Sequence, residues 1–232
     1  MRVLVVHNYP ATGLGQVGAA LAEAGAELDQ RMAHDGEALP ATSDGYDAAL
    51  LLGGGQNALA DEAYPYFPAL LDLARDFTAR DKAVLGICLG SQLLARAFGG
   101  ENRIGGAREF GWCPVSLTGE GAVDPVLGGV APEFRIFQWH DDTFTLPPGA
   151  AHLASSGVAN SQAFRLGRAT YGVQFHFEAD RKLVHEWNTA FAGTIAERQP
   201  DWPDRYESEA ARHGPGADAA GLAIARAWVG LI

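Results

Sequence analysis

The stretch Ala83-Val84-Leu85-Gly86-Ile87-Cys88-Leu89-Gly90 places a cysteine between two glycines at the end of an apolar run. The apolar part, 83–87, is typical of a strand covered on both faces, and residues 91–98 are typical of a helix. A G-x-nucleophile-x-G segment between a strand and a helix forms a sharp turn, because a Cβ at either glycine would clash. The turn sets the sulfur at a helix N-terminus, where free N–H groups favour a thiolate. Cys88 is therefore predicted to be a nucleophile, with a buried structural cysteine as the alternative.

Two further apolar runs, Val3–Val6 and Ala48–Leu52, predict strands that precede Cys88. Residues at helical spacing follow each run, from Leu14 to Met32 and over 66–80. The alternation of strand and helix predicts an α/β fold with a mostly parallel central sheet flanked by helices.

After residue 100 the pattern changes to short strands joined by Gly/Pro turns, which predicts a smaller antiparallel β portion. We expect those strands at 112–117, 133–139 and 144–146, then a strand at 171–178 and a helix at 179–197. Residues 1–196 are predicted to form one domain. Residues 197–232 are predicted to form a C-terminal tail in two parts, of which 217–232 is a helix that packs on the domain. A dimer contact is the alternative for that helix.

The segment Tyr171–Glu178 alternates between apolar and polar residues. On a strand, His176 and Glu178 share one face, because successive side chains point to opposite sides. A carboxylate on the far nitrogen of an imidazole holds the tautomer that a base beside a thiol needs. We therefore predict that His176 and Glu178 serve Cys88, with the polar face of an edge strand as the alternative.

Gly53-Gly54-Gly55 directly follows the apolar run that ends at Leu52. Acyl chemistry needs backbone N–H donors aimed at the developing oxyanion. The N–H of Leu89, just after the nucleophile, and that of Gly54 are the predicted donors. The alternative is a tight turn with no role in chemistry.

Composition limits the classes of partner. The 232 residues carry a net charge of −11, without a basic cluster, which disfavours nucleic acid and anionic membranes as partners.

Two cysteines, with no signal segment and no apolar stretch of about 20 residues, lead us to expect a cytoplasmic protein. The histidines other than those named lack ligand spacing, so no metal is predicted. Gly13-Leu14-Gly15-Gln16-Val17-Gly18 matches a dinucleotide pattern, but Asn8–Thr12 separate it from the strand, and no phosphate-binding P-loop occurs, so no cofactor is predicted.

Together, Gly86-Ile87-Cys88-Leu89-Gly90-Ser91-Gln92 and Gly172-Val173-Gln174-Phe175-His176-Phe177-Glu178 resemble the class I (triad type) glutamine amidotransferases. The likeness covers roughly residues 1–195 and implies a flavodoxin-like fold. Glu109–Val115 and Gln138–Asp142 are similar to the amidotransferase domain of GMP synthase and its stand-alone relatives, which include γ-glutamyl peptidases. Two departures occur, since Gly55 replaces the usual proline of the oxyanion turn and Phe177 stands where proline is common.

The resemblance implies that Cys88 attacks the amide of glutamine or another γ-glutamyl compound, forming a γ-glutamyl thioester. His176 would act as base and then acid, and Glu178 would orient it. Binding of the substrate is implied for Gln92 and the segment Glu109, Phe110 and Gly111, and the turn at His140 and Asp142 would lie near the site. Ammonia would pass to a separate synthetase subunit, or the protein would be a hydrolase in its own right, such as a γ-glutamyl peptidase. A non-catalytic regulatory subunit is the further alternative.

Overall fold

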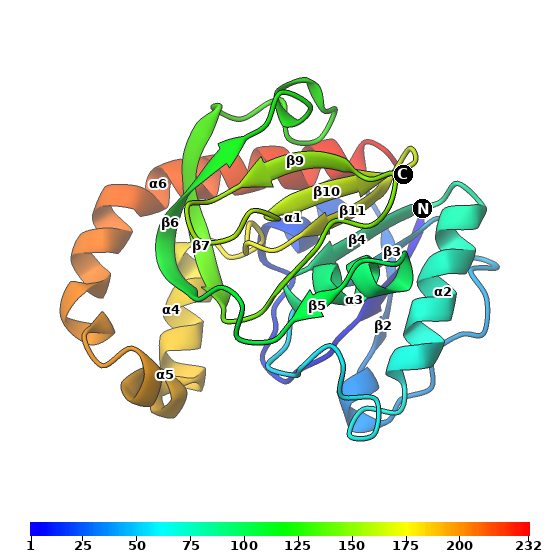
Figure 1. The fold of residues 1–232 in the computed structure, drawn as a ribbon, viewed down its shortest axis with the longest axis horizontal. Coiled ribbons are helices and arrows are strands. Elements are labelled where there is room, and N and C mark those ends of the chain that lie inside the picture. Colours follow the sequence, from blue (N-terminus) through cyan, green and yellow to red (C-terminus); the bar gives the residue numbers. More distant parts are fainter.

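The computed structural model describes the whole chain, Met1–Ile232, and centres on a nine-stranded sheet in the order β2-β1-β3-β4-β11-β10-β9-β6-β7 (Figure 1). The first five strands in this order pair in parallel, and the pairings from β11 to β7 are antiparallel. The parallel strands are β1 (Arg2–Val6), β2 (Glu27–Arg31), β3 (Ala48–Leu51), β4 (Ala83–Ile87) and β11 (Thr170–Val173). The others are β6 (Glu109–Leu117), β7 (Glu133–His140), β9 (Ala151–Ser155) and β10 (Ala163–Leu166).

Helices cover the sheet, and a small second sheet pairs β5 (Asn102–Arg103) with β8 (Thr143–Phe144). The α-helices are α1 (Gly15–Glu23), α2 (Phe67–Ala79), α3 (Leu89–Ala97), α4 (Arg181–Ala190), α5 (Ala192–Arg198) and α6 (Trp202–Val229). None of them combines the length and the apolar character that crossing a bilayer requires. The predicted α/β class, with its parallel strands and helical layers, is confirmed.

The apolar run of β1 contributes to both layers of the core. Val3 and Val5 pack in the cluster that contains α1 and α6, whereas Leu4 and Val6 pack in the cluster that contains α2 and α3. Because neighbouring side chains on a strand point to opposite faces, a strand between two helical layers must be apolar throughout.

The predicted helical spacing from Leu14 to Met32 is wrong in its second half. Helix α1 ends at Glu23, the chain turns at Gly25 with a φ of +67°, and Leu28 lies in β2. Strand β2 pairs only with β1 and forms an edge of the sheet, so its residues are half-buried and largely polar. A strand of this composition lacks the apolar run that identified β1, β3 and β4.

The strand predicted at 171–178 ends earlier, at Val173. Its parallel pairing with β4 stops there, because β4 itself ends at Ile87 in the turn that carries Cys88. The following residues leave β4: the N–H of Gln174 donates to the carbonyl of Gln162, and that of His176 to the carbonyl of Phe137 in β7. His176 and Glu178 therefore lie on an irregular segment beyond the strand.

The C-terminal residues form one helix rather than a polar part followed by a helix. Helix α6 is continuous through Pro215 and bends around the body of the protein (Figure 1). Proline inside a helix removes one hydrogen bond. Burial of Trp202, Ile224 and Trp228 in the main core offsets that loss, since each of these side chains is at most 1% exposed.

Helices α1 and α6 both contact the backbone that leads from β11 to Glu178. The Gln16 side chain in α1 donates to the carbonyl of Phe177 at 3.0 Å, and the N–H of Gln16 donates to the carbonyl of Glu178 at 2.9 Å. A Cβ at Gly221 of α6 would lie 2.2 Å from the Phe177 carbonyl oxygen, and one at Gly15 would lie 1.9 Å from that of Glu178. Gly15, which belongs to the dinucleotide-like motif, thus allows α1 to approach the Glu178 backbone closely.

Replacing Gly221 with alanine is expected to lower the free energy of unfolding by about 1–3 kcal/mol, because the added methyl group overlaps the Phe177 backbone. Gly216→Ala in the same helix is the matched control, since a Cβ there meets nothing within 4 Å. That control is expected to raise stability by up to about 1 kcal/mol, because alanine favours helix over glycine. Urea denaturation measures both, and equal effects of the two substitutions would contradict the close contact at Gly221.

Candidate active site

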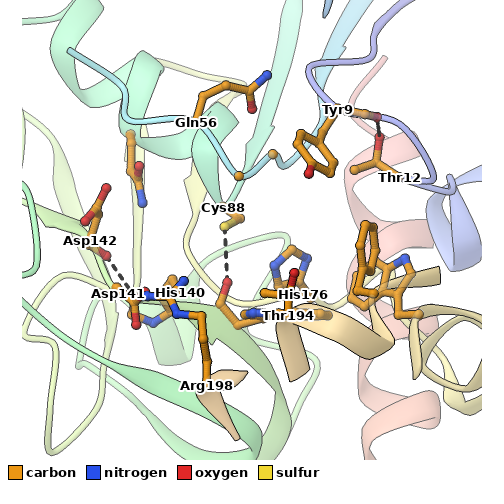
Figure 2. A pocket seen from close by; sticks show the side chains of 16 residues that line it. Tyr9, Thr12, Gln56, Cys88, His140, Asp141, Asp142, His176, Thr194 and Arg198 are labelled. Atoms are coloured by element: carbon orange, nitrogen blue, oxygen red, sulfur yellow. Dashed lines mark hydrogen bonds and ion pairs between the residues drawn. The ribbon is translucent and has the colours of Figure 1, made fainter. Parts of the chain in front are cut away.

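A cavity of about 300 Å³ opens at the carboxyl edge of the parallel strands (Figure 2). Cys88 follows β4, Gly54 and Gly55 follow β3, and His176 follows β11. Because these three strands are neighbours in the sheet, the residues lie together at its carboxyl edge. Open α/β sheets usually bind ligands at this edge. The cavity is lined by Tyr9, Thr12, Gly54, Gly55, Gln56, Cys88, Gln92, Trp139, His140, Asp141, Asp142, His176, Trp187, Phe191, Thr194 and Arg198.

Cys88 has strained backbone angles, with φ 51° and ψ −110°, between β4 and the first residue of α3. The turn requires both flanking glycines: a Cβ at Gly86 would lie 2.4 Å from the Gly90 carbonyl oxygen, and one at Gly90 would lie 2.2 Å from that of Leu51. The thiol is 5% exposed, lines the cavity and donates weakly to the Trp139 carbonyl oxygen at 3.7 Å. The predicted elbow is thus present, and its sulfur faces the cavity.

His176 and Glu178 form a buried pair, with 2.6 Å between imidazole Nδ1 and carboxylate Oε1. His176 also lies beside Cys88, since a Cβ at Gly53 would stand 3.2 Å from His176 Cε1 and 3.5 Å from Cys88 Cβ. Burial alone lowers the pKa of His176, but the charges of Glu178 and the Cys88 sulfur, with their hydrogen bonds, raise this pKa well above its ordinary value. A thiol, an imidazole and a carboxylate in this order can support nucleophilic catalysis.

The glycine turn after β3 is anchored through Asn8, which is fully buried at the end of β1. Asn8 Nδ2 donates to the Leu52 carbonyl at 2.7 Å, just before the turn, and the Gln56 side chain, just after it, donates to the Asn8 carbonyl. The hydroxyl of Tyr66 donates to Asn8 Oδ1 at 3.1 Å. Both ends of the turn are therefore fixed to one residue. Gly54 lines the cavity, and Leu89 begins α3, where N–H groups have no partner within the helix.

Asp142 lies on the side of the cavity away from Tyr9 and Thr12 (Figure 2), and Gln92 also lines the cavity. The Gln92 side chain donates to Gln174 Oε1 at 3.2 Å. His140 Nδ1 lies 2.9 Å from the Asp142 carbonyl oxygen, and Asp142 Oδ1 accepts from the Gly105 N–H at 2.7 Å. The turn thus has a fixed conformation that presents its carboxylates to the cavity.

Glu109, Phe110 and Gly111, which the resemblance implies for substrate binding, do not border the cavity. Phe110 packs edge-on against Trp202 of α6, and a Cβ at Gly111 would lie 3.1 Å from the Trp202 ring. Glu109 lies behind His140, with 3.3 Å between its Oε2 and His140 Nε2, because the two residues are cross-strand partners on β6 and β7. The Glu109 carboxylate thus contacts the His140 side chain and does not itself border the cavity.

Sequence reasoning missed the wall formed by Tyr9, Thr12, Trp187, Phe191, Thr194 and Arg198. These residues come from the segment after β1 and from α4 and α5, which lie far apart in the sequence. Trp187 and Phe191 show helical spacing, which indicates packing against a core and says nothing of a cavity. Asp141, which forms an ion pair with Arg198, was also missed as a lining residue.

Replacing Glu178 with glutamine is expected to lower the pKa of His176, because it removes the carboxylate charge that favours the imidazolium. The imidazolium of the unchanged protein then persists to higher pH than that of the variant. An NMR titration of the imidazole nitrogens measures both values, with Glu186→Gln, an exposed carboxyl change on α4, as control. An unchanged His176 titration in Glu178→Gln would contradict the assigned pairing.

Known proteins resemble this chain in sequence. The family model described as "Glutamine amidotransferase class-I" matches residues 16–186. The glutamine amidotransferase-like protein YfeJ of Salmonella typhimurium is 34% identical over 147 residues, which are 62% of this chain and 61% of that protein. One subunit of the glutamine-hydrolyzing GMP synthase from Natronomonas pharaonis is 42% identical over 113 residues, which are 48% of this chain and 56% of that relative. The chain thus spans less than two thirds of the length of these two relatives.

Solved structures agree along the whole chain. A glutamine amidotransferase from Thermotoga maritima superposes with a TM-score of 0.88 at 25% identity, covering 100% of this chain and 97% of that one. A glutamine amidotransferase from Methylobacillus flagellatus superposes with a TM-score of 0.88 at 28% identity, covering 100% and 95%. From the matched family model and these likenesses, the chain belongs to the class I glutamine amidotransferase family.

Proposed function

We propose that the protein hydrolyses a γ-glutamyl amide bond, with Cys88 as nucleophile, His176 as base and then acid, and Glu178 as the group that orients His176. The observation that supports this most is the meeting of the strained Cys88 turn with the hydrogen-bonded His176–Glu178 pair at one cavity. Family membership makes glutamine the first substrate to consider.

In the proposed reaction, the Cys88 thiol gives its proton to His176 and the sulfur bonds to the γ-carbonyl carbon, while the N–H groups of Leu89 and Gly54 receive the oxyanion. The C–N bond then breaks, and the nitrogen leaves with a proton from His176 as ammonia or an amine. Water adds to the resulting γ-glutamyl thioester, and its proton passes to His176. The C–S bond breaks and glutamate is released.

The glutamyl part of the substrate is proposed to bind between Gln92 and the turn at His140–Asp142. Gln92 is 3% exposed and has its amide at the cavity, where it can hydrogen-bond a polar group of the substrate. The carboxylate of Asp142 is suited to an ammonium group. Glu109 would act only through His140, and Phe110 and Gly111 only through packing.

The fate of the leaving group divides two versions of this proposal. One of the relatives is named as part of GMP synthase, which favours transfer of ammonia to a separate synthetase. The alternative is a γ-glutamyl peptidase that releases an amine to water, and it needs no partner. A regulatory protein without activity is disfavoured by the complete set of Cys88, His176 and Glu178. Both cysteines are unpaired, which suits a reducing compartment, so we place the protein in the cytoplasm.

Replacing Cys88 with alanine is expected to lower the rate of glutamate release from L-glutamine by several orders of magnitude, because members of a catalytic triad act as a unit. Cys113→Ala is the matched control. Burial, together with the charge of Glu109, raises the pKa of Cys113 to about 11, so its thiol stays protonated at neutral pH. A coupled assay for glutamate measures all three proteins.

The control is expected to retain activity within a few fold of the unchanged protein. Activity that survives in Cys88→Ala, or that disappears in Cys113→Ala alone with the fold intact, would contradict the assigned nucleophile. A substrate panel of glutamine and γ-glutamyl peptides, run with the unchanged protein, separates the two versions of the proposal.

A further inference from the structure

We infer that the cavity contains a subsite for an apolar or aromatic leaving group, formed by Tyr9, Trp187 and Phe191. This inference rests on the proposed function and concerns the amine released from the γ-glutamyl amide. It selects a substrate class with a leaving group larger than ammonia.

The chemistry fixes where the leaving group lies. As the C–N bond breaks, the nitrogen must take a proton from His176, so the amine has to be within hydrogen-bond reach of that imidazole. The glutamyl part extends to the other side of Cys88, toward Gln92 and Asp142. Figure 2 shows the same division, with Asp142 on one side of Cys88 and Tyr9 and Thr12 on the other.

The wall on the His176 side is a continuous aromatic surface. The Trp187 ring stands edge-on to the His176 ring, with 5.1 Å between centroids. The surface continues to Trp139, whose ring centroid lies 6.0 Å from that of Trp187 and 5.4 Å from that of Phe191. It ends at Tyr9, whose ring centroid lies 6.0 Å from that of Phe191. An amine leaving from Cys88 would therefore meet aromatic rings from the proton donor outward.

This wall has a fixed shape. Trp187 is 4% exposed, and its indole N–H donates to the Ala11 carbonyl at 3.1 Å, which joins α4 to the segment after β1. In that same segment, the hydroxyl of Thr12 donates to the Tyr9 carbonyl at 2.8 Å. Tyr9 itself is 38% exposed and forms the rim. A preformed apolar surface binds a ligand without the cost of ordering side chains.

The charges around the cavity favour an uncharged group at this wall. Arg198 is the one lysine or arginine that lines the cavity, and Asp141 already forms an ion pair with it. The one remaining carboxylate that lines the cavity belongs to Asp142, on the side away from Tyr9. Ammonia has almost no apolar area to bury, whereas burial of an apolar group against aromatic rings is favourable in proportion to its area. The volume of about 300 Å³ lies at the lower end of small-molecule sites, about 300–1,000 Å³, and suits one ring rather than a long chain.

The test compares three substrates with the full chain: L-glutamine, γ-glutamylmethylamide and γ-glutamylbenzylamide. The benzylamide is expected to have a kcat/KM at least about tenfold higher than the methylamide, the size of effect that apolar contacts of this kind produce. Tyr9→Ala and Phe191→Ala are each expected to reduce this ratio toward one. Phe98→Ala, which removes a half-buried ring at the end of α3 that does not line the cavity, is the control and is expected to keep the ratio.

The outcomes separate this inference from the proposed function. Glutamate release from glutamine, with the methylamide as good a substrate as the benzylamide, would overturn the subsite and leave the hydrolase proposal standing. An unchanged ratio in Tyr9→Ala and Phe191→Ala would also overturn it. No glutamate from any of the three substrates would overturn both. Tyr9 lies at the rim, so Tyr9→Ala keeps the test valid if Phe191→Ala fails to fold.

Discussion

The turn at Cys88 is the constraint on which the site depends. A residue other than glycine with positive φ raises the free energy of the fold by about 1–3 kcal/mol, and the surrounding structure must hold it in place. Here β4 pairs with β3 on one side and β11 on the other, while α3 begins at the next residue and packs back on the sheet. Gly86 and Gly90 let these parts approach to distances that a Cβ would prevent. The sulfur therefore has one position, at the edge where the neighbouring strands end.

The partners of Cys88 are held from the opposite layer of the fold. Beyond Val173 the segment with His176 and Glu178 no longer pairs with β4, so its position depends on the bond from the His176 N–H to Phe137 of β7 and on contacts made by α1 and α6. Helix α6 approaches this segment at Gly221, within a long helix that packs two tryptophans into the core. The C-terminal helix is thus part of what fixes the site, although none of its residues lines the cavity.

Much of the site could be predicted because its chemistry leaves local patterns in the sequence. The Cys88 turn combines an apolar strand, two glycines and a helix start, and His176 and Glu178 stand two residues apart, so short-range rules were enough. Strand β2 could not be predicted, because an edge strand of polar composition has no apolar run. The continuous helix α6 contradicts the local preference of Pro215, since tertiary packing outweighs that preference. The aromatic wall depends on contacts between α4 and the segment after β1, which no local pattern encodes. Glu109 was implied to bind the substrate, but the register of β6 with β7 places it behind His140, and no local pattern specifies that register.

The central claim is that the Cys88 sulfur reacts with the γ-carbon of a bound glutamyl group. Peptide mapping by mass spectrometry, after incubation with a chloroketone analogue of glutamine, tests it most directly, because that reagent alkylates a thiolate placed beside the bound amide position. One adduct is expected, on the peptide that contains Cys88, and excess glutamine is expected to protect that peptide. Labelling of Cys113 instead, or labelling of Cys88 that glutamine does not slow, would contradict it.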